Sequence, residues 1–203
     1  MTMPLRPERG GFLRPFGCGM FIRDFLLGQA SKYWEEIPDI DPDVGAPQRD
    51  IHYWYKRALL RAFAEDTVAR EEEQRMNKGL PPMTIEQAEE RTRLHLERIP
   101  YKLTRCRFHS FVVYFSNLQR LGWVEPTGKE EPSEFQDHYS SGPPRRYFRL
   151  TGAGMQAADA AWSNPLFALY GERWDREHLR QLRKKHKYTT GGKRGRPVKA
   201  KRS

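Results

Sequence analysis

The chain has 203 residues, of which 37% are hydrophobic and 31% are charged, with a formal net charge of +10. This length allows one domain with a substantial core plus extensions, and no stretch approaches the ~20 apolar residues of a membrane-spanning helix. The two cysteines, Cys18 and Cys106, and the six histidines are scattered without disulfide or metal-ligand spacing. We therefore expect an intracellular protein with no metal, no cofactor and no membrane contact, located in the cytoplasm or nucleoid, or in the nucleus of a eukaryote.

The excess positive charge is concentrated at the C-terminal end of the sequence. Ten of the 36 Lys and Arg residues lie at 183–203, where there is no acidic residue, so the other 26 match the 26 acidic residues in number. A block of like charge repels itself and is typical of an arm that binds nucleic acid or an anionic membrane. We therefore predict a disordered basic tail at 183–203.

The first half of the sequence predicts a flexible start and three helices. Residues 1–19 are rich in Gly, Pro and Arg and predict a flexible arm. An N-terminal extension, made of an amphipathic helix and a Pro/Asp linker at 37–48, is expected within 20–49. Asp50 is expected to N-cap the next helix, which ends near Gly79. The pattern Thr84-x-x-Gln87 predicts a capping box that opens another helix, ending near Arg98.

The second half predicts one more helix and a β-hairpin. A helix is expected at 104–121, with Gly122 at its end. Strands are expected at 123–127 and 145–151, separated by a polar loop. An Ala-rich helix broken at 163–165 and a helical extension over 163–182 follow. The expected core face of the helix at 104–121 consists of Phe108, Phe111, Val112, Phe115, Leu118 and Leu121.

This order of helix, helix, helix, strand, loop and strand is that of a winged helix. The stretch "NLQRLGWVE" at 117–125 resembles the end of the recognition helix and the first wing strand of MarR- and PadR-type regulators. The stretch "YFRLTGAG" at 147–154 resembles their returning wing strand and the next helix start, and Thr151 is expected to cap that helix. The resemblance implies a mainly α-helical fold with a small β wing (α+β), in which a winged helix-turn-helix domain spans 50–162.

A winged helix of this type implies a DNA-binding face. Its third helix would lie in the major groove, and its wing would contact the phosphate backbone or the minor groove. Dimerisation through helices outside the wing is usual for such regulators, which makes 20–36 and 166–183 the candidate homodimer segments. The expected DNA contacts from helix and wing are Arg105, Arg107, His109, Ser110, Asn117, Arg120, Arg145, Arg146 and Arg149.

The basic tail contains a second motif. The segment Lys193-Arg194-Gly195-Arg196-Pro197 resembles the core of the AT-hook of high-mobility-group A chromatin proteins. The resemblance implies that Arg194 and Arg196 enter the narrow minor groove of A·T-rich DNA. Gly195 would allow close approach of the backbone, Pro197 would favour an extended path, and the flanking Lys193 would meet phosphate.

The sequence therefore favours a non-enzymatic DNA-binding protein, either a transcriptional regulator or an architectural factor, whose partner is double-stranded, A·T-rich DNA. No nucleotide-binding Gly-rich loop, G-x-S-x-G or H-E-x-x-H motif indicates a catalytic site. Two alternatives remain open. One is an RNA- or ribosome-associated winged-helix protein, since a charge run does not distinguish RNA from DNA. The other is a protein-interaction scaffold in which the aromatic-rich segment 20–63 forms the interface.

Overall fold

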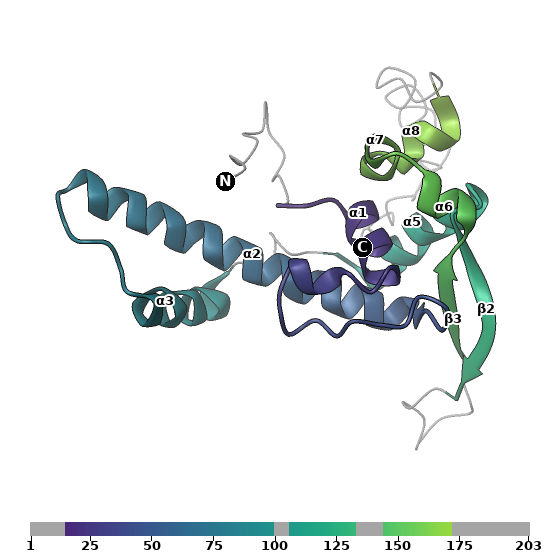
Figure 1. Ribbon diagram of the computed structural model, residues 1–203, viewed down its shortest axis with the longest axis horizontal. Helices are drawn as coiled ribbons and strands as arrows, with labels where there is room; N and C mark the ends of the chain where they lie inside the picture. The colour runs from purple at the N-terminus through teal and green to yellow at the C-terminus, as the bar shows by residue number, and fades with distance from the viewer. Residues whose placement is uncertain (1–14, 100–105, 133–143, 172–203) are drawn as a thin grey trace, which may run out of the picture. The chain divides into compact units, whose positions relative to one another are not determined.

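The computed structural model describes residues 15–99, 106–132 and 144–171, and it is mostly helical with a small antiparallel sheet (Figure 1). This confirms the expected α+β class. The chain divides into two units, 1–165 and 166–203, and of the second unit only 166–171 are described. The elements are α1 (Cys18–Leu26), the short 3-10 helix η1 (Ala30–Lys32), β1 (Ala46–Pro47), α2 (Gln48–Asn77), α3 (Ile85–Arg98), α5 (Phe108–Arg120), β2 (Val124–Glu131), β3 (Arg145–Leu150), α6 (Gly152–Gln156), α7 (Asp159–Ser163) and α8 (Pro165–Tyr170).

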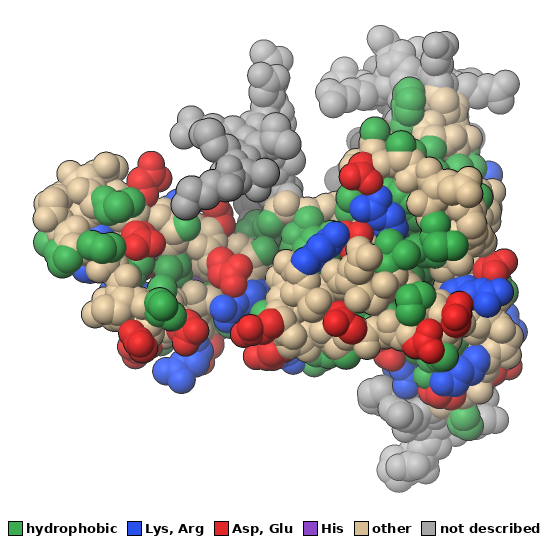
Figure 2. Space-filling model, viewed as in Figure 1, with side chains coloured by type: hydrophobic (Ala, Val, Ile, Leu, Met, Phe, Trp, Pro, Cys, Tyr) green, Lys and Arg blue, Asp and Glu red, His purple; other side chains and the backbone are tan. Residues whose placement is uncertain are grey.

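Helices α2 and α3 form a long antiparallel hairpin in which α3 packs on the C-terminal half of α2 (Figure 1). The predicted capping box opens α3: the Gln87 backbone N–H donates to Thr84 Oγ1 at 3.3 Å, and the Thr84 N–H donates to Gln87 Oε1 at 3.1 Å. Within α3 only Thr92 is buried. Hydrophobic side chains are exposed near the turn of this hairpin (Figure 2), so α3 adds little to the core.

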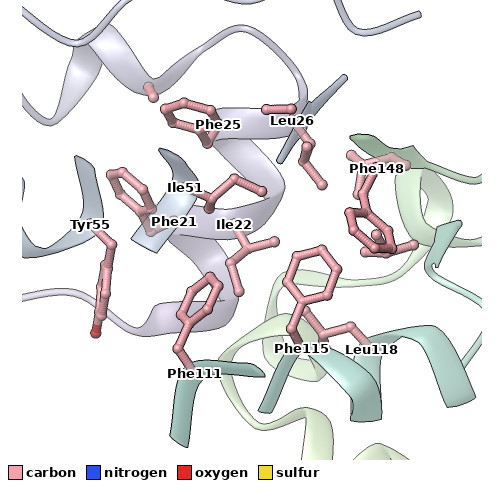
Figure 3. Close-up of a cluster of buried hydrophobic side chains, with 14 of the residues drawn as sticks. Phe21, Ile22, Phe25, Leu26, Ile51, Tyr55, Phe111, Phe115, Leu118 and Phe148 are labelled. Carbon is pink, nitrogen blue, oxygen red and sulfur yellow. The ribbon is translucent and has the colours of Figure 1, made fainter. Parts of the chain in front are cut away.

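The hydrophobic core is built from α1, α2, α5 and the sheet. Phe21, Ile22, Phe25 and Leu26 of α1 are at most 2% exposed and lie among side chains from the other elements (Figure 3). The expectation for 20–49 was a separate extension in front of the domain, but the core crosses the expected boundary at residue 50. The partners of the α1 side chains in Figure 3 are Ile51, Tyr55, Phe111, Phe115, Leu118 and Phe148.

The sheet has three strands in the order β1-β3-β2, all antiparallel to their neighbours. The expected linker at 37–48 therefore ends in a strand, because Ala46 and Pro47 pair with Phe148 and Tyr147. Gly45 permits this pairing: its φ is +71°, and a Cβ at this position would lie 2.0 Å from the Phe148 carbonyl oxygen. A side chain larger than hydrogen would push β1 away from β3.

Two helical segments differ from the predictions, one in where it begins and the other in its continuity. Helix α2 begins at Gln48 after Pro47, so the prediction that Asp50 is its N-cap is wrong; Asp50 lies in the first turn. The Ala-rich segment forms two short helices, α6 and α7, because Ala157 has a ψ of 133° and interrupts the helix. Thr151 caps α6 as expected, accepting the Gly154 N–H at 3.0 Å, and Trp162 Nε1 donates back to the Gly154 carbonyl at 3.0 Å.

Candidate nucleic-acid interface

Helix α5 is anchored by one side and exposed on the other. It begins at Phe108 rather than at the expected Thr104, and Arg107 occupies its N-cap position. Phe111, Phe115 and Leu118 are buried, at 1%, 0% and 0% exposure, as predicted. The other three residues of the expected core face are less buried: Phe108 is 38% exposed, and Val112 and Leu121 are partly buried. This packing fixes which side of α5 faces outward.

The outward side of α5 carries short polar and basic side chains. Ser110, Val113, Asn117 and Arg120 follow one another at spacings of three or four residues, so they form one stripe along the helix. His109 and Ser110 are exposed in the first turn, and Arg120 in the last, where its Nη1 lies 3.5 Å from Asn117 Oδ1. No acidic residue occurs between Phe108 and Arg120, so no carboxylate on α5 offsets these cations.

The arginines of the β2–β3 hairpin are arranged differently, because carboxylates of β2 lie opposite them. Arg146 Nε donates to Glu130 Oε1 at 2.9 Å, and Arg149 Nε donates to Glu125 Oε1 at 2.9 Å. Both pairs are exposed. Hydrogen bonds from Tyr147 and Lys129 lower the pKa of Glu131, so Lys129 is paired as well. The hairpin therefore presents cations and carboxylates in nearly equal number.

Arg145 binds within the protein. Its Nη2 lies 2.6 Å from both carboxylate oxygens of Asp50, and its side chain is only 20% exposed. This contact joins the start of β3 to the first turn of α2. The geometry gives Arg145 a structural contact in place of the solvent-facing position that a DNA contact requires.

Two residues of α2, Arg49 and His52, contact Phe108 at the start of α5, Lys56 lies near His52, and none of the three is among the predicted site residues. Arg49, His52 and Lys56 are spaced by three and four residues, which places them on one stripe of α2. The Arg49 guanidinium lies 5.8 Å from the centroid of the Phe108 ring. His52 Nε2 lies 2.8 Å from the Cys106 carbonyl oxygen, and burial, with Lys56 as a lesser cause, lowers the pKa of His52. The spacing of these basic side chains along one side of a predicted helix is the sequence signal that could have indicated them.

Several expected site residues lie outside the described residues. These are Arg105 and the tail motif Lys193, Arg194, Gly195, Arg196 and Pro197. The homodimer segments are covered in part: the apolar side chains of α1 are buried in the chain's own core, and 166–183 is described only to Gly171. The structure thus brings Arg107, His109, Ser110, Asn117 and Arg120 together on α5, and places Arg145, Arg146 and Arg149 along β3.

No group of three or more His, Cys, Asp or Glu side chains in 15–99, 106–132 and 144–171 could hold a metal ion. Within the same ranges no helix has the length and apolar character needed to cross a membrane.

Comparisons of the chain with protein-family models, with curated proteins and with solved structures find no match. The resemblance to MarR- and PadR-type regulators therefore stays a prediction from two short sequence stretches.

Proposed function

We propose that this protein is a non-enzymatic DNA-binding protein that inserts α5 into the major groove of double-stranded DNA. The observation that carries the proposal is the outward face of α5, which combines basic, hydroxyl and amide side chains with no carboxylate. A helix of this length extends about 20 Å, and a major groove ~12 Å wide admits it. Arginine and asparagine read base edges through paired hydrogen bonds, and Ser110 can bond to several bases.

The order of the core elements supports a winged-helix arrangement. Helices α1, α2 and α5, followed by β2 and β3, repeat the order helix, helix, helix, strand, loop and strand once α3 is treated as an insertion. In this proposal α1 becomes the first of the three helices and α2 the second, where the sequence predicts α2 first and α3 second. The domain would then begin near residue 18 instead of residue 50, and α5 keeps the role of recognition helix.

Phosphate contacts would come mainly from the residues around the start of α5. Arg49 of α2 and Arg107, the N-cap residue of α5, border this end of the helix, where the unpaired backbone N–H groups also favour an anion. Lys56 lies close to His52, which packs on the same end. The exposed ion pairs of Arg146 and Arg149 contribute little free energy in water. Each arginine can therefore exchange its glutamate for a phosphate, but the exchange adds only a small binding free energy. We give Arg145 no contact with DNA.

The tail motif at 193–197 would add a second contact in an adjacent A·T-rich minor groove. A single short motif of this kind binds weakly, but tethering it to α5 raises its effective concentration at the same DNA molecule. Because the tail also holds ten cations and no acid, it would contribute most of the salt dependence of binding. Both a transcriptional regulator and an architectural factor fit this arrangement.

Competition binding with the full chain tests the proposal. An A·T-rich duplex, a G·C-rich duplex and a structured RNA of equal length would each compete for the protein at two salt concentrations. We expect the A·T-rich duplex to bind at least about tenfold more tightly than the other two, a difference of ~1.4 kcal/mol. Equal affinity for the two duplexes would contradict the proposal that the tail binds an A·T-rich minor groove. Preference for the RNA would favour the RNA-associated alternative over DNA binding.

A further inference from the structure

Three aromatic rings gather around one arginine on the outside of α2. The Arg57 guanidinium lies 5.0 Å from the ring centroid of Trp34, 5.5 Å from that of Tyr53 and 5.7 Å from that of Trp54. Arg57 Nη1 also donates a hydrogen bond to Tyr53 Oη at 2.7 Å. Tyr53 is 49% exposed, and both tryptophans are partly exposed. This surface therefore already binds one guanidinium group by stacking and remains open to solvent.

The chain next to these rings is acidic. Glu35, Glu36, Asp39, Asp41 and Asp43 follow Trp34 within nine residues, and all five side chains are exposed. No basic residue lies within 35–43, and none of the five carboxylates forms an ion pair with another described residue. With Arg57 included, the surface formed by residues 34–43, Tyr53, Trp54 and Arg57 has a formal charge of −4. We call it the aromatic–acidic surface.

Other acidic side chains of the same unit are paired with cations. Asp24 binds Lys32 Nζ at 2.7 Å, Asp50 binds Arg145, and Glu125 binds Arg149. In those cases the carboxylate stabilises a contact within the fold. The carboxylates at 35–43 form no ion pair with a described residue, and Asp41 Oδ1 accepts only the Asp43 backbone N–H, at 2.9 Å, so their attraction for cations is directed outward.

The rings of the aromatic–acidic surface lie away from α5, whereas Asp43, at the end of its acidic segment, lines a hollow together with Glu125 and Arg149 of the hairpin. His52 contacts the start of α5, and a helix turns by about 100° per residue, so Trp54 and Arg57 lie roughly 200° and 140° around α2 from His52. The rings of Trp34 and Trp54 are 6.1 Å apart, which joins the acidic segment to this side of α2. Occupation of the aromatic–acidic surface would therefore leave α5 accessible.

We propose that the aromatic–acidic surface docks an arginine-rich, acid-free segment of a partner protein. Its charge of −4 attracts a cationic chain, and its rings favour the planar guanidinium group, which stacks on aromatic faces as Arg57 does. Lysine offers the same charge on a strongly hydrated ammonium group and stacks less well. Tryptophan, tyrosine and arginine are also the residues that contribute most often to strong protein–protein contacts. The proposal does not depend on DNA binding.

Binding of synthetic peptides to the full chain, without nucleic acid, tests this docking. The probes are nona-arginine and nona-lysine, measured by fluorescence anisotropy. We expect nona-arginine to bind about threefold more tightly than nona-lysine, and Tyr53→Ala to remove that difference, since an exposed cation–π contact is worth ~0.5–1 kcal/mol. The combined change Glu35→Gln, Glu36→Gln and Asp39→Asn should weaken both peptides by about tenfold, because it removes three carboxylates from a nearby cation.

The matched control neutralises three exposed carboxylates on the α2–α3 hairpin, Glu73→Gln, Glu89→Gln and Glu90→Gln, with the same change in net charge. We expect this control to change peptide affinity by less than about twofold. An equal loss from the control would show nonspecific charge attraction and overturn the proposal, as would equal affinity for the two peptides in the unaltered chain. A photo-reactive phenylalanine derivative at position 53 that cross-links to residues 183–203 of the same chain, instead of to the peptide, would assign the surface to the chain's own tail.

Discussion

Helix α5 and the β2–β3 hairpin both carry the basic side chains expected at a DNA-binding face, but they differ in what those side chains face. On α5 the cations share the outward side with serine and asparagine, and the helix holds no carboxylate. In the hairpin, Arg146 and Arg149 each bind a glutamate of β2, and Arg145 binds Asp50. The count of arginines in a sequence segment therefore does not tell how much uncompensated positive charge its surface presents to a phosphate.

Strand pairing explains the difference. The register places Glu125 opposite Arg149, Glu130 opposite Arg146 and Glu131 opposite Arg145, so each arginine of β3 has a carboxylate across the sheet. Opposite charges at such positions stabilise a pair of strands by a few tenths of a kcal/mol to about 1 kcal/mol. On a helix the nearest side chains come from the same helix, three and four residues away, and α5 supplies no acid there. The hairpin uses its arginines for folding, whereas α5 leaves its basic side chains directed outward.

The largest expected effect is on α5. The double change Arg107→Ala and Arg120→Ala should weaken binding to a DNA duplex by about 100-fold, since a phosphate or base contact from arginine is worth ~1–3 kcal/mol. Arg93→Ala with Arg98→Ala is the matched control, because both are exposed arginines on helix α3 with the same total charge. Fluorescence anisotropy at fixed salt measures both variants. Equal losses in the two would mean that net charge, and not the α5 face, determines affinity.

The next effect concerns stability. Arg145→Ala should lower the free energy of unfolding by about 1–3 kcal/mol, because it removes a charge-assisted contact that joins β3 to α2. Urea denaturation of Arg145→Ala, Asp50→Ala and the double variant isolates the energy of the pair. Additive losses would show that the two side chains do not stabilise each other and would return Arg145 to the list of candidate DNA contacts.

A smaller effect on DNA affinity is expected from the carboxylates that neutralise the hairpin arginines. Glu125→Gln with Glu130→Gln removes the carboxylates that Arg146 and Arg149 bind, so duplex affinity should increase about threefold, which corresponds to less than 1 kcal/mol for exposed charges. Affinity is measured against the same duplex, with Glu73→Gln and Glu90→Gln as the variant of equal charge. A gain that is no larger than the gain of this control would exclude a role for the hairpin arginines.

The smallest effect is on pH dependence. Burial lowers the pKa of His52 in the folded state below its ordinary value of 6.5, so the unfolded chain takes up a proton first as the pH falls. The free energy of unfolding should therefore decrease as the pH falls from 6.5 through the folded pKa, and His52→Gln should remove this component. Urea midpoints at several pH values measure it, with His109→Gln as the exposed control. If the pH profile of unfolding in His52→Gln equals that of the unaltered chain, His52 is not the source of this pH dependence.

Local signals in the sequence predicted local structure well. The capping box at Thr84 and Gln87, the turn at Gly122 and the cap of α6 by Thr151 all depend on residues within four positions of one another, and the structure has each of them. Alternation at 145–151 predicted β3, and the three-or-four spacing of Phe111, Phe115 and Leu118 predicted the buried side of α5. Such features are set by backbone geometry and periodicity, which a sequence displays directly.

Features that depend on distant residues were missed. Strand β1 is only two residues long and exists because Gly45 lets the chain approach Phe148, about 100 residues later. Helix α1 was expected to be an extension, since its amphipathic pattern does not say which element covers its apolar side. The pairing of Arg145 with Asp50 requires the position of β3 against α2. For the same reason the sequence did not indicate that Arg49 and His52 are neighbours of α5.

Selection of binding sites from a random DNA library tests the central claim most directly, because it reports which side chains read bases. The full chain, Ser110→Ala and Asn117→Ala would be compared after each variant is shown to unfold at the same urea concentration as the unaltered chain. We predict that each change alters the preferred sequence at one or two adjacent base pairs while leaving the rest of the site intact. Identical preferred sequences for all three proteins, or no selected sequence at all, would contradict the role of α5 as the element that reads DNA.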